Sequence, residues 1–483
     1  MDTADLIEVL ADRLGPASVL TAQSELEAFQ ADLLNKYRVP ALCVVKPANT
    51  EEVAATVRLA REAGVKVTPA GGRTGFAGGA VAREGTSQIV VSLERMRSIR
   101  ALSPVDDVIV CDAGVTLAEI RQAAEAADRY FPVSHGGEGT SQIGGMVATN
   151  AGGNNVLRYG MARANILGLE VVLASGDVWD GLRALRKDNS GYDLKQMFVG
   201  SEGTLGIVTA AALRLQPRPR ERASALCAVP GPQAALELYN TVRSSAGELL
   251  SAFELMPHSG LELHLARAET TQVPLSGRHE WMVLLEAETS IPDLDLGGLL
   301  ERLLGEALEQ GLIEDAAVAR SLAQRNAMWA LREGMAEAQA SSRLVIKSDT
   351  SVPVSAVAEF VDRATKAIHA LLPDAVPIPF GHIGDGNIHF NIGAPPGMSA
   401  ETFASNEARL SDAVCDTAIQ LGGSISAEHG IGQLKLDKLR KAKSKTELEM
   451  MQRLKNSFDP DNLMNPGKIV EADDPALKQE AQS

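Results

Sequence analysis

The chain has 483 residues, which at ~150 residues per domain predicts more than one folding unit. Its formal net charge of −16 argues against nucleic acid and against an anionic membrane surface as partners. Apolar residues make up 45% of the chain, yet no apolar run approaches the ~18 residues of a membrane span, and the acidic N-terminus does not resemble a signal peptide. Four widely spaced cysteines without a CxxC pair argue against a disulfide framework and a thiolate metal cluster. We therefore expect a soluble, cytoplasmic protein of several domains.

The first part of the chain predicts helices and strands joined by loops that are rich in glycine. In chain order, the hydrophobic periodicity predicts helix 2–14, strand 41–47, helix 50–64, strand 65–70, strand 88–93, strand 108–114 and helix 116–128. The glycine loops read GGRTGFAGGA, SHGGEGTSQIGGMVATNAGGNNVLRYG and GSEGTLGIVT, and they begin at residues 71, 134 and 200.

The glycine loops indicate a binding surface. Several glycines in one loop let the backbone approach a ligand and point successive N–H groups at a phosphate or pyrophosphate. The patterns GxGxxG, GxxxxGK[ST] and GxSxG are all missing from the sequence, so the classical dinucleotide site, the P-loop and the hydrolase elbow lose support. Any one loop is more simply a tight turn between strands. Three loops in succession favour one large ligand that is held at several points.

A change in amino-acid composition near residue 218 predicts a domain boundary. The segment 213–223 is rich in proline and charge, as is typical of a crossing between domains. Residues 224–455 then alternate strand-like and helical runs, which predicts an antiparallel sheet with helices on one face. We expect an α+β protein with domains at 1–217 and 218–455 and a turn-rich C-terminal segment at 456–483.

The three loops closely resemble the FAD-binding domain of the vanillyl-alcohol oxidase (PCMH-type) flavoprotein superfamily. The resemblance implies a PCMH-type domain at 1–217, a cap domain with the substrate residues, and a C-terminal return to the first domain. It implies that the FAD pyrophosphate is contacted by the backbone of Gly71, Gly72, Arg73, Thr74 and Gly75. It implies that the flavin is lined by Thr140, Gly144, Thr149, Gly152 and Gly153, with Asn465 near the ring. It implies that the far side of FAD is contacted by Glu202, Gly203 and Ile207. Arg73 stands where some members tether FAD through a His, so we expect non-covalent FAD.

Four residues with metal-binding or acid–base side chains gather in two short motifs of the second domain. His382 and His389 bracket the turn in GHIGDGNIH, and Glu428 and His429 stand in SAEHGIG. Two neutral imidazoles and one carboxylate match a catalytic divalent-metal site with positions left open for substrate. Asn391 lies two residues after His389 on the same predicted strand, so the two side chains share a face.

These motifs resemble the D-2-hydroxy-acid dehydrogenase branch of the same superfamily, most closely the D-2-hydroxyglutarate dehydrogenases. The resemblance implies His382, His389 and Glu428 as ligands of zinc or manganese, and His429 as the catalytic base that also touches substrate. It implies substrate contacts from Asn391, Arg332 and Lys347. Two cations besides the metal suit a dicarboxylate, so 2-hydroxyglutarate leads. Ala336 stands where those enzymes place a Thr, so D-lactate and glycolate stay open as substrates.

Two other function classes fit parts of the sequence. A FAD-carrying subunit of an electron-transfer complex would be catalytic only with partners, and a metallohydrolase would use the glycine loops for a phosphate ester. For the dehydrogenase, the electron acceptor is open among an electron-transfer flavoprotein, a quinone, a cytochrome and oxygen, and no nicotinamide site is visible. A homodimer is the default oligomeric state.

Overall fold

The protein divides into two compact units in a computed structural model that describes residues 1–268 and 272–470. The first unit comprises Met1–Gly153, Gly160–Arg218 and the chain from Glu428 onward, and the second comprises Asn154–Tyr159 and Pro219–Ala427. The chain returns to the first unit well before the predicted residue 456. The reason is local, because Gln433 donates hydrogen bonds from its backbone N to Ala77 O at 2.9 Å and from Nε2 to Gly78 O at 3.1 Å, in the first glycine loop.

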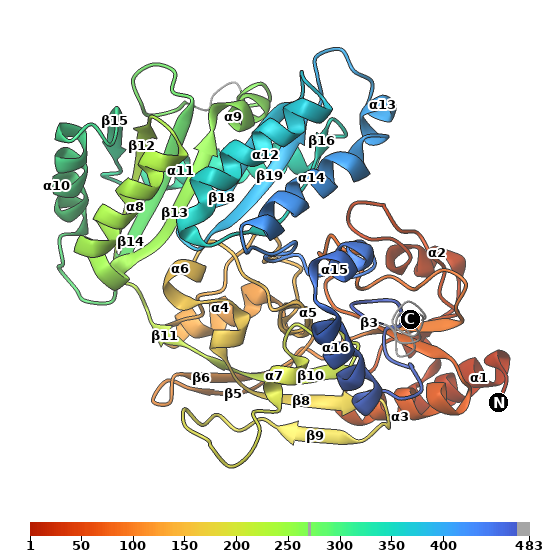
Figure 1. Ribbon diagram of the computed structural model, residues 1–483. Coiled ribbons are helices and arrows are strands. Elements are labelled where there is room, and N and C mark those ends of the chain that lie inside the picture. The colour runs from red at the N-terminus through yellow and green to blue at the C-terminus, as the bar shows by residue number, and fades with distance from the viewer. Residues whose placement is uncertain (269–271, 471–483) are drawn as a thin grey trace. The chain divides into compact units, whose positions relative to one another are not determined.

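The first unit contains two sheets (Figure 1). One has the order β1-β2-β4-β3, in which β2, β4 and β3 are parallel and β1 is antiparallel to β2. The other is antiparallel, with the order β5-β6-β10-β8-β9. The strands are β1 (Val19–Leu20), β2 (Val44–Val45), β3 (Lys66–Ala70), β4 (Gln88–Ser92), β5 (Ile99–Ser103), β6 (Val108–Asp112), β8 (Ile166–Leu173), β9 (Val178–Gly181) and β10 (Gly206–Arg214), with β7 (Arg129–Tyr130) and β11 (Gln216–Pro217) as a separate pair.

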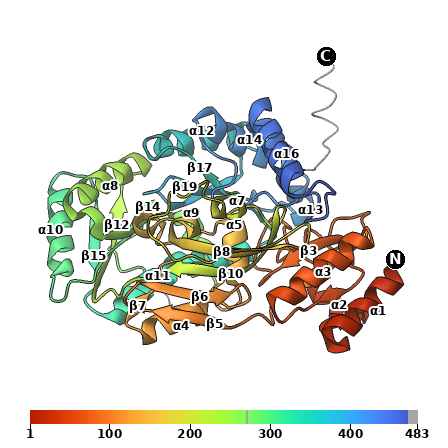
Figure 2. The ribbon, with the colours of Figure 1, turned by 90° about the horizontal axis from the view of Figure 1, so that it is seen from below.

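Three helices of the first unit lie where the sequence predicts them, namely α1 (Thr3–Leu14), α3 (Thr50–Glu62) and α4 (Leu117–Ala126). The others are α2 (Gln23–Leu26), α5 (Ile143–Thr149), α7 (Lys195–Phe198), α15 (Leu436–Ala442) and α16 (Lys445–Phe458). Asp2 caps α1 with a reciprocal capping box, and Leu6 and Leu10 bury one face of that helix. Figure 2 shows α1 beside α3, whose apolar residues belong to the same core. Helix α5 was not predicted, because it forms inside the second glycine loop.

A buried ion pair fixes the C-terminal return of the chain. Lys455, on α16, is 1% exposed and donates to Thr204 O and Met464 O at 2.8 Å each, and to the carboxylate of Asp459. Asp459 is fully buried and also accepts from the backbone N of Leu463 and of Met464. Burial lowers the pKa of Lys455, while the Asp459 carboxylate raises it. The pair therefore joins α16 to the segment that leads into Asn465.

Replacing Asp459 by Asn is expected to destabilise the first unit by about 3–5 kcal/mol, because the lysine charge stays buried without its partner. Chemical denaturation followed by circular dichroism measures this loss. The matched control is Asp437→Asn, since Asp437 pairs with Arg440 but its side chain is 88% exposed. Such surface pairs contribute little, so that variant should unfold like the wild type. Equal stability of all three proteins would contradict a role for the buried pair.

The second unit is built on one antiparallel sheet of eight strands. Seven follow the order β15-β12-β14-β13-β18-β19-β16, and β17 pairs with β19. The strands are β12 (Glu221–Val229), β13 (Leu250–Pro257), β14 (Trp281–Thr289), β15 (Asp315–Val318), β16 (Val345–Ile346), β17 (Thr350–Ser351), β18 (Val376–His382) and β19 (Asn387–Gly393). The helices are α6 (Val156–Tyr159), α8 (Pro232–Ala246), α9 (His258–Leu265), α10 (Leu296–Glu309), α11 (Leu322–Ala340), α12 (Val357–Leu371), α13 (Ala400–Ala404) and α14 (Glu407–Gln420).

Helices cover both faces of this sheet, so the prediction of helices on one face was wrong. Cys227, Phe253 and Leu285 point into a core shared with α8, α10, α12 and α14, and α8 and α12 lie in front of the strands in Figure 1. The neighbouring residues Leu226 and Leu284 point to the opposite face, into a second core shared with α9 and α11. Strands buried on both faces lose the clean apolar–polar alternation that marks a one-sided sheet. Helices α9 and α11 cover the second face, which the alternation of strand-like and helical runs did not reveal.

The four cysteines are free and buried. Burial raises the pKa of the Cys43 thiol to about 12, and it raises the pKa of Cys111 and Cys227 as well. Thiols that stay protonated are poor nucleophiles and metal ligands.

In the described part of the chain, every helix is too short or too polar to cross a bilayer.

Candidate active site

The first two glycine loops pack against one another so tightly that only glycine fits at key positions. A Cβ on Gly72 would lie 1.9 Å from Thr140 O, so the backbone at Gly71 and Gly72 lies directly against the segment at 140–142. This brings together two of the three loops that the sequence assigned to one ligand. Within the second loop, a Cβ on Gly153, whose φ is 125°, would lie 1.8 Å from Ser134 O.

Two buried side-chain oxygens near these loops accept no hydrogen bond from the described residues. They are Oε1 of Gln142, which is 3.6 Å from the position of a Cβ on Gly71, and Oδ1 of Asn465. The amide nitrogen of Asn465 donates to Gly79 O at 2.9 Å and to Glu202 O at 2.7 Å, so its oxygen is held in a fixed direction. Buried acceptors normally have partners. The two oxygens and the close-packed glycine backbone fit a bound cofactor with polar edges, as FAD has.

Several predicted cofactor residues use their side chains within the protein. Arg73 adopts a left-handed backbone with φ of 56°, and its guanidinium lies 4.1 Å from the centre of the Phe29 ring. The predicted contact between the backbone of Arg73 and a pyrophosphate stays a prediction. Thr149 Oγ1 donates to Gly145 O at 2.9 Å, and Ile207 belongs to the apolar core. His135 Nδ1 accepts from Gly137 N at 3.2 Å, so it has a structural partner within the second loop.

The remaining predicted cofactor residues keep their places in the three loops. Thr74, Gly144 and Gly152 lie within the first two loops, and Gly203 follows Glu202 in the third with a left-handed φ of 72°. The roles of all these residues toward FAD stay predictions.

Replacing Gly72 by Ala is expected to lower the FAD content of the purified protein strongly, because the new methyl group would push the first loop away from Thr140. The flavin absorbance per protein measures this loss. Gly139→Ala is the control, since a Cβ on Gly139 also meets no atom within 4 Å and Gly139 is not among the predicted FAD contacts. A Gly72→Ala protein that binds FAD like the Gly139→Ala protein would contradict the predicted role of the first loop.

His382 and His389 lie on the two strands of a hairpin in the second unit. His382 ends β18, His389 follows the turn on β19, and their ring centres are 5.9 Å apart. The β18–β19 register pairs Phe380 with His389, and these rings are 5.1 Å apart. The hairpin predicted from GHIGDGNIH is therefore confirmed, and it brings both imidazoles together. Asp385 accepts from Asn387 N at 3.1 Å and so stabilises the turn between the two strands.

The structure brings the three predicted metal ligands together. Ligand atoms of His382, His389 and Glu428 all lie within 4.8 Å of one another. Ligand atoms of Asp349, His389 and His429 also lie within 4.8 Å of one another. Two imidazoles and a carboxylate at this spacing suit a divalent ion, and they fit the predicted ligand set.

His429 is held against the first glycine loop within the first unit. Its ring centre lies 4.8 Å from that of Phe76. Just beyond it, the carboxylate of Glu202 accepts from Ile431 N at 2.7 Å and from Gly432 N at 2.8 Å. Burial raises the pKa of Glu202, while these two backbone hydrogen bonds lower it. The third glycine loop thus positions the segment that carries the candidate base next to the first glycine loop.

Arg332 lies on α11 and is 5% exposed. Its Nε donates to Glu254 Oε2 at 2.9 Å, and its guanidinium carbon is 4.9 Å from the centre of the Phe380 ring. Glu254 Oε1 also contacts His382 Nδ1 at 2.6 Å. Although burial by itself raises the pKa of Glu254, the charges and hydrogen bonds of His382 and Arg332 lower it to about 2. Arg332 and His382 are thereby linked through one carboxylate.

Two other predicted substrate residues lie on the same sheet. Lys347 is half-buried directly after β16. Asn391 is buried, its Oδ1 accepts from Ser348 N at 3.0 Å, and its Nδ2 donates to Gln339 Oε1 at 2.9 Å. An amide has two donor hydrogens and two acceptor lone pairs, so one of each remains for a ligand. The substrate contacts of both residues stay predictions.

Three residues of the site were missed in the sequence. Glu254 contacts Arg332 and His382, Asp349 lies beside His389 and His429, and Gln142 carries one of the two unpaired oxygens. Asp349 could have been found from the sequence, since it stands in the segment KSDTS two residues after Lys347, whereas Glu254 lies in an apolar strand far from every motif.

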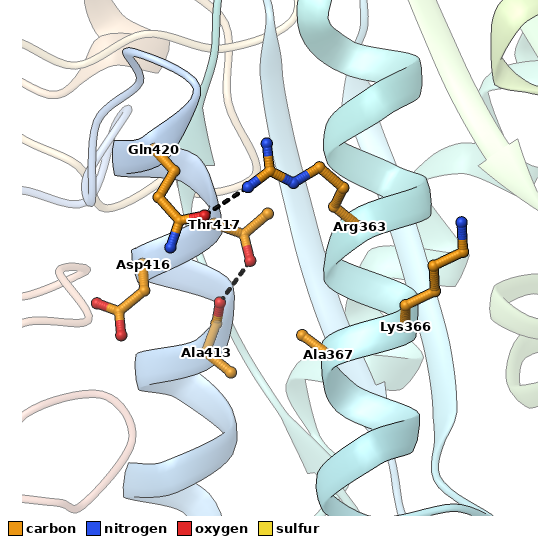
Figure 3. Close-up of a pocket in the computed structure, with 7 residues that line it drawn as sticks. All are labelled: Arg363, Lys366, Ala367, Ala413, Asp416, Thr417 and Gln420. Atoms are coloured by element: carbon orange, nitrogen blue, oxygen red, sulfur yellow. Dashed lines mark hydrogen bonds between the residues drawn. The ribbon is translucent and has the colours of Figure 1, made fainter.

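Figure 3 shows a groove between α12 and α14 that is lined by Arg363, Lys366 and neighbouring residues, and none of these is a predicted site residue.

Two family models match the chain. The FAD binding domain matches residues 41–181, and the C-terminal domain of FAD linked oxidases matches residues 218–469. The second match covers the histidine hairpin of the second unit, and the first covers the first two glycine loops.

Full-length relatives agree with the family models. A Stutzerimonas stutzeri (strain A1501) protein named D-2-hydroxyglutarate dehydrogenase is 36% identical, over 97% of this chain and 99% of the relative. A mitochondrial D-2-hydroxyglutarate dehydrogenase of Bos taurus is 36% identical over 95% of this chain and 82% of its own. A Schizosaccharomyces pombe protein that is provisionally named as a mitochondrial D-lactate dehydrogenase is 36% identical over 93% of this chain and 86% of its own.

Solved structures show the fold. P-cresol methylhydroxylase with substrate bound matches with a TM-score of 0.77 at 14% identity, over 98% of this chain and 97% of the other. The 4-ethylphenol oxidase of Gulosibacter chungangensis matches with a TM-score of 0.73 at 17% identity, over 96% of each chain. Together with the glycine loops and the relatives, these matches establish that the chain belongs to the FAD-linked oxidase family and is a FAD-dependent dehydrogenase with a PCMH-type fold.

Proposed function

We propose that the protein oxidises a D-2-hydroxy acid to the 2-oxo acid, with D-2-hydroxyglutarate as the leading substrate and a divalent metal ion in the site. The observation that carries the proposal is that ligand atoms of His382, His389 and Glu428 lie within 4.8 Å of one another. The candidate base His429 directly follows Glu428 in the chain. Relatives whose names include D-2-hydroxyglutarate dehydrogenase, at 36% identity over nearly the full length, support the same reaction.

Each residue has a defined task in this proposal. Arg332 offers a planar, two-pronged grip to a carboxylate, and Lys347 adds a second positive charge. Asn391 contributes one hydrogen bond to the substrate, from the part of its side-chain amide that makes no hydrogen bond within the protein. His429 removes the proton of the α-hydroxyl, which an imidazole does well because its unperturbed pKa is ~6.5.

Two bound groups complete the chemistry. His382, His389 and Glu428 would hold a zinc or manganese ion, which would supply Lewis-acid chemistry at the α-hydroxyl. The glycine loops would hold FAD without a covalent link, and FAD would supply the two-electron acceptor for the hydrogen of C2. The chain then has to hold C2 close to the flavin, which is the task of the carboxylate-binding cations.

The residues near Arg332 say least about the part of the substrate that lies far from the reacting carbon. Ala336 lies one helical turn after Arg332 and offers no hydroxyl, and it packs among apolar residues of α9 and α11. The provisional name of the S. pombe relative also favours D-lactate as the second candidate. Lactate has only one carboxylate, so it could use only one of the two cations for substrate binding.

A dye-reduction screen tests the proposal. The FAD-loaded protein, with zinc or manganese, is supplied with D- and L-2-hydroxy acids and an artificial electron acceptor. We expect D-2-hydroxyglutarate to give the largest kcat/KM and the L-acids to give none. A preference for D-lactate would remove the dicarboxylate argument but keep the reaction class. If no 2-hydroxy acid reduces the dye, the proposed reaction is wrong.

A further inference from the structure

Glu254 is a buried carboxylate at the pairing of β13 with β18. In that register it stands opposite His382. Its two oxygens serve different partners, because Oε1 contacts His382 Nδ1 at 2.6 Å and Oε2 accepts from Arg332 Nε at 2.9 Å. Glu254 is 1% exposed, so both contacts are shielded from water.

The same residues form a closed ring of contacts on one face of the sheet. From Arg332 the ring runs through Glu254 to His382, then to His389 at 5.9 Å between ring centres. It continues to Phe380 at 5.1 Å and closes where Arg332 lies 4.9 Å from the Phe380 ring centre. Each member is held by two others, so displacing Glu254 would release a histidine and an arginine together.

The chemistry of the two contacts fixes which atoms remain for ligands. An ionised carboxylate only accepts hydrogen bonds, so the proton of a neutral His382 lies on Nδ1 and its Nε2 is left as the metal-binding atom. A carboxylate behind a metal-binding histidine orients the ring and strengthens the bond to the metal. Arg332 uses Nε for Glu254, and neither of its Nη atoms makes a hydrogen bond to a described residue. Those two nitrogens supply the fork that a substrate carboxylate would occupy.

Glu286 shows what a purely structural carboxylate looks like on the same face. It lies on the neighbouring strand β14 and accepts from Arg325 Nε at 2.7 Å, from Trp329 Nε1 at 2.8 Å and from Ser224 Oγ at 2.6 Å. None of these partners is a candidate ligand of metal or substrate. Glu254 and Glu286 therefore share burial and an arginine partner, and only Glu254 contacts a metal-binding histidine.

We propose that Glu254 is a positioning residue that couples metal binding to substrate recognition, because one carboxylate orients both His382 and Arg332. This inference rests on the proposed function for the roles of those two residues. It adds a prediction of its own, namely that a single substitution far from both motifs weakens the affinity for metal and for substrate at the same time.

The test compares Glu254→Gln with Glu286→Gln in the FAD-loaded protein. Zn²⁺ affinity is measured on metal-free protein by competition with a chromophoric chelator, and we expect Glu254→Gln to weaken it by about 10–100-fold. At saturating Zn²⁺ we expect KM for D-2-hydroxyglutarate to rise by a larger factor than kcat falls, because the grip of Arg332 is loosened. Glu286→Gln should keep the Zn²⁺ affinity and KM of the wild type. Thermal melts check that both variants are folded.

A second variant decides the outcome if Glu254→Gln does not fold. Glu254→Asp keeps the charge but is one methylene shorter and cannot reach both partners, so we expect a smaller loss of Zn²⁺ affinity in the same direction. Wild-type Zn²⁺ affinity in the folded Glu254 variant, equal losses in the Glu286 variant, or a wild type that binds no Zn²⁺ would each overturn the inference. If the wild type oxidises no 2-hydroxy acid but Zn²⁺ affinity falls in the Glu254 variant alone, the proposed reaction fails while the link between Glu254 and His382 stands.

Discussion

His429→Ala is expected to lower kcat for the 2-hydroxy acid by more than ~100-fold while FAD stays bound, because the substitution removes the base and leaves the glycine loops unchanged. His429 packs on Phe76 of the first loop, and the Glu202 carboxylate holds the residues after it by their backbone N–H groups. Those backbone hydrogen bonds do not depend on the imidazole. Steady-state dye reduction measures the rate, and flavin absorbance measures the bound FAD.

A histidine elsewhere in the chain gives the control. His279 contacts Glu314 and Ser276 O and belongs to neither motif, so His279→Ala should turn over like the wild type. A His429→Ala enzyme with nearly full kcat would show that another group takes the proton. Asp349 would then be the next candidate, since its carboxylate groups with His389 and His429.

Removal of the metal is expected to lower kcat/KM by at least ~100-fold, because Lewis-acid stabilisation of the developing alkoxide is worth several kcal/mol and each ~1.4 kcal/mol is tenfold in rate. Chelator treatment of the wild type removes the ion and leaves every side chain in place. Added Zn²⁺ or Mn²⁺ should then restore the rate. His382→Ala should reproduce the loss, and added metal should not rescue it.

The bound FAD distinguishes this effect from a general loss of structure. His382 belongs to the hairpin of the second unit, whereas the residues assigned to FAD belong to the first unit, so flavin absorbance should be unchanged in both the chelated and the His382→Ala proteins. Full activity after complete removal of the metal, confirmed by metal analysis, would contradict the Lewis-acid role. It would also leave His382 with the structural role of a partner for Glu254.

The local features of the protein followed from the sequence. The capped helix at the N-terminus, the strands around the first glycine loop and the hairpin with His382 and His389 each depend on residues that are near one another in the chain. Alternation along a strand also placed His389 and Asn391 on one face without knowledge of the neighbours. The family resemblance of the loops was carried by such short motifs and is confirmed by the family models.

Contacts between distant parts of the chain were decided by the tertiary structure alone. Glu254 is 128 residues from His382 and 78 from Arg332, and it meets both only because β13 pairs with β18 in one register. A shift of that register by one residue would turn the carboxylate to the opposite face of the sheet. The apolar strand around Glu254 gave no sign of this contact, and the sequence of α11 did not reveal that this helix covers a second face of the sheet. The sequence by itself therefore determined which side chains bring the chemistry, while the sheet register decided which buried groups hold them.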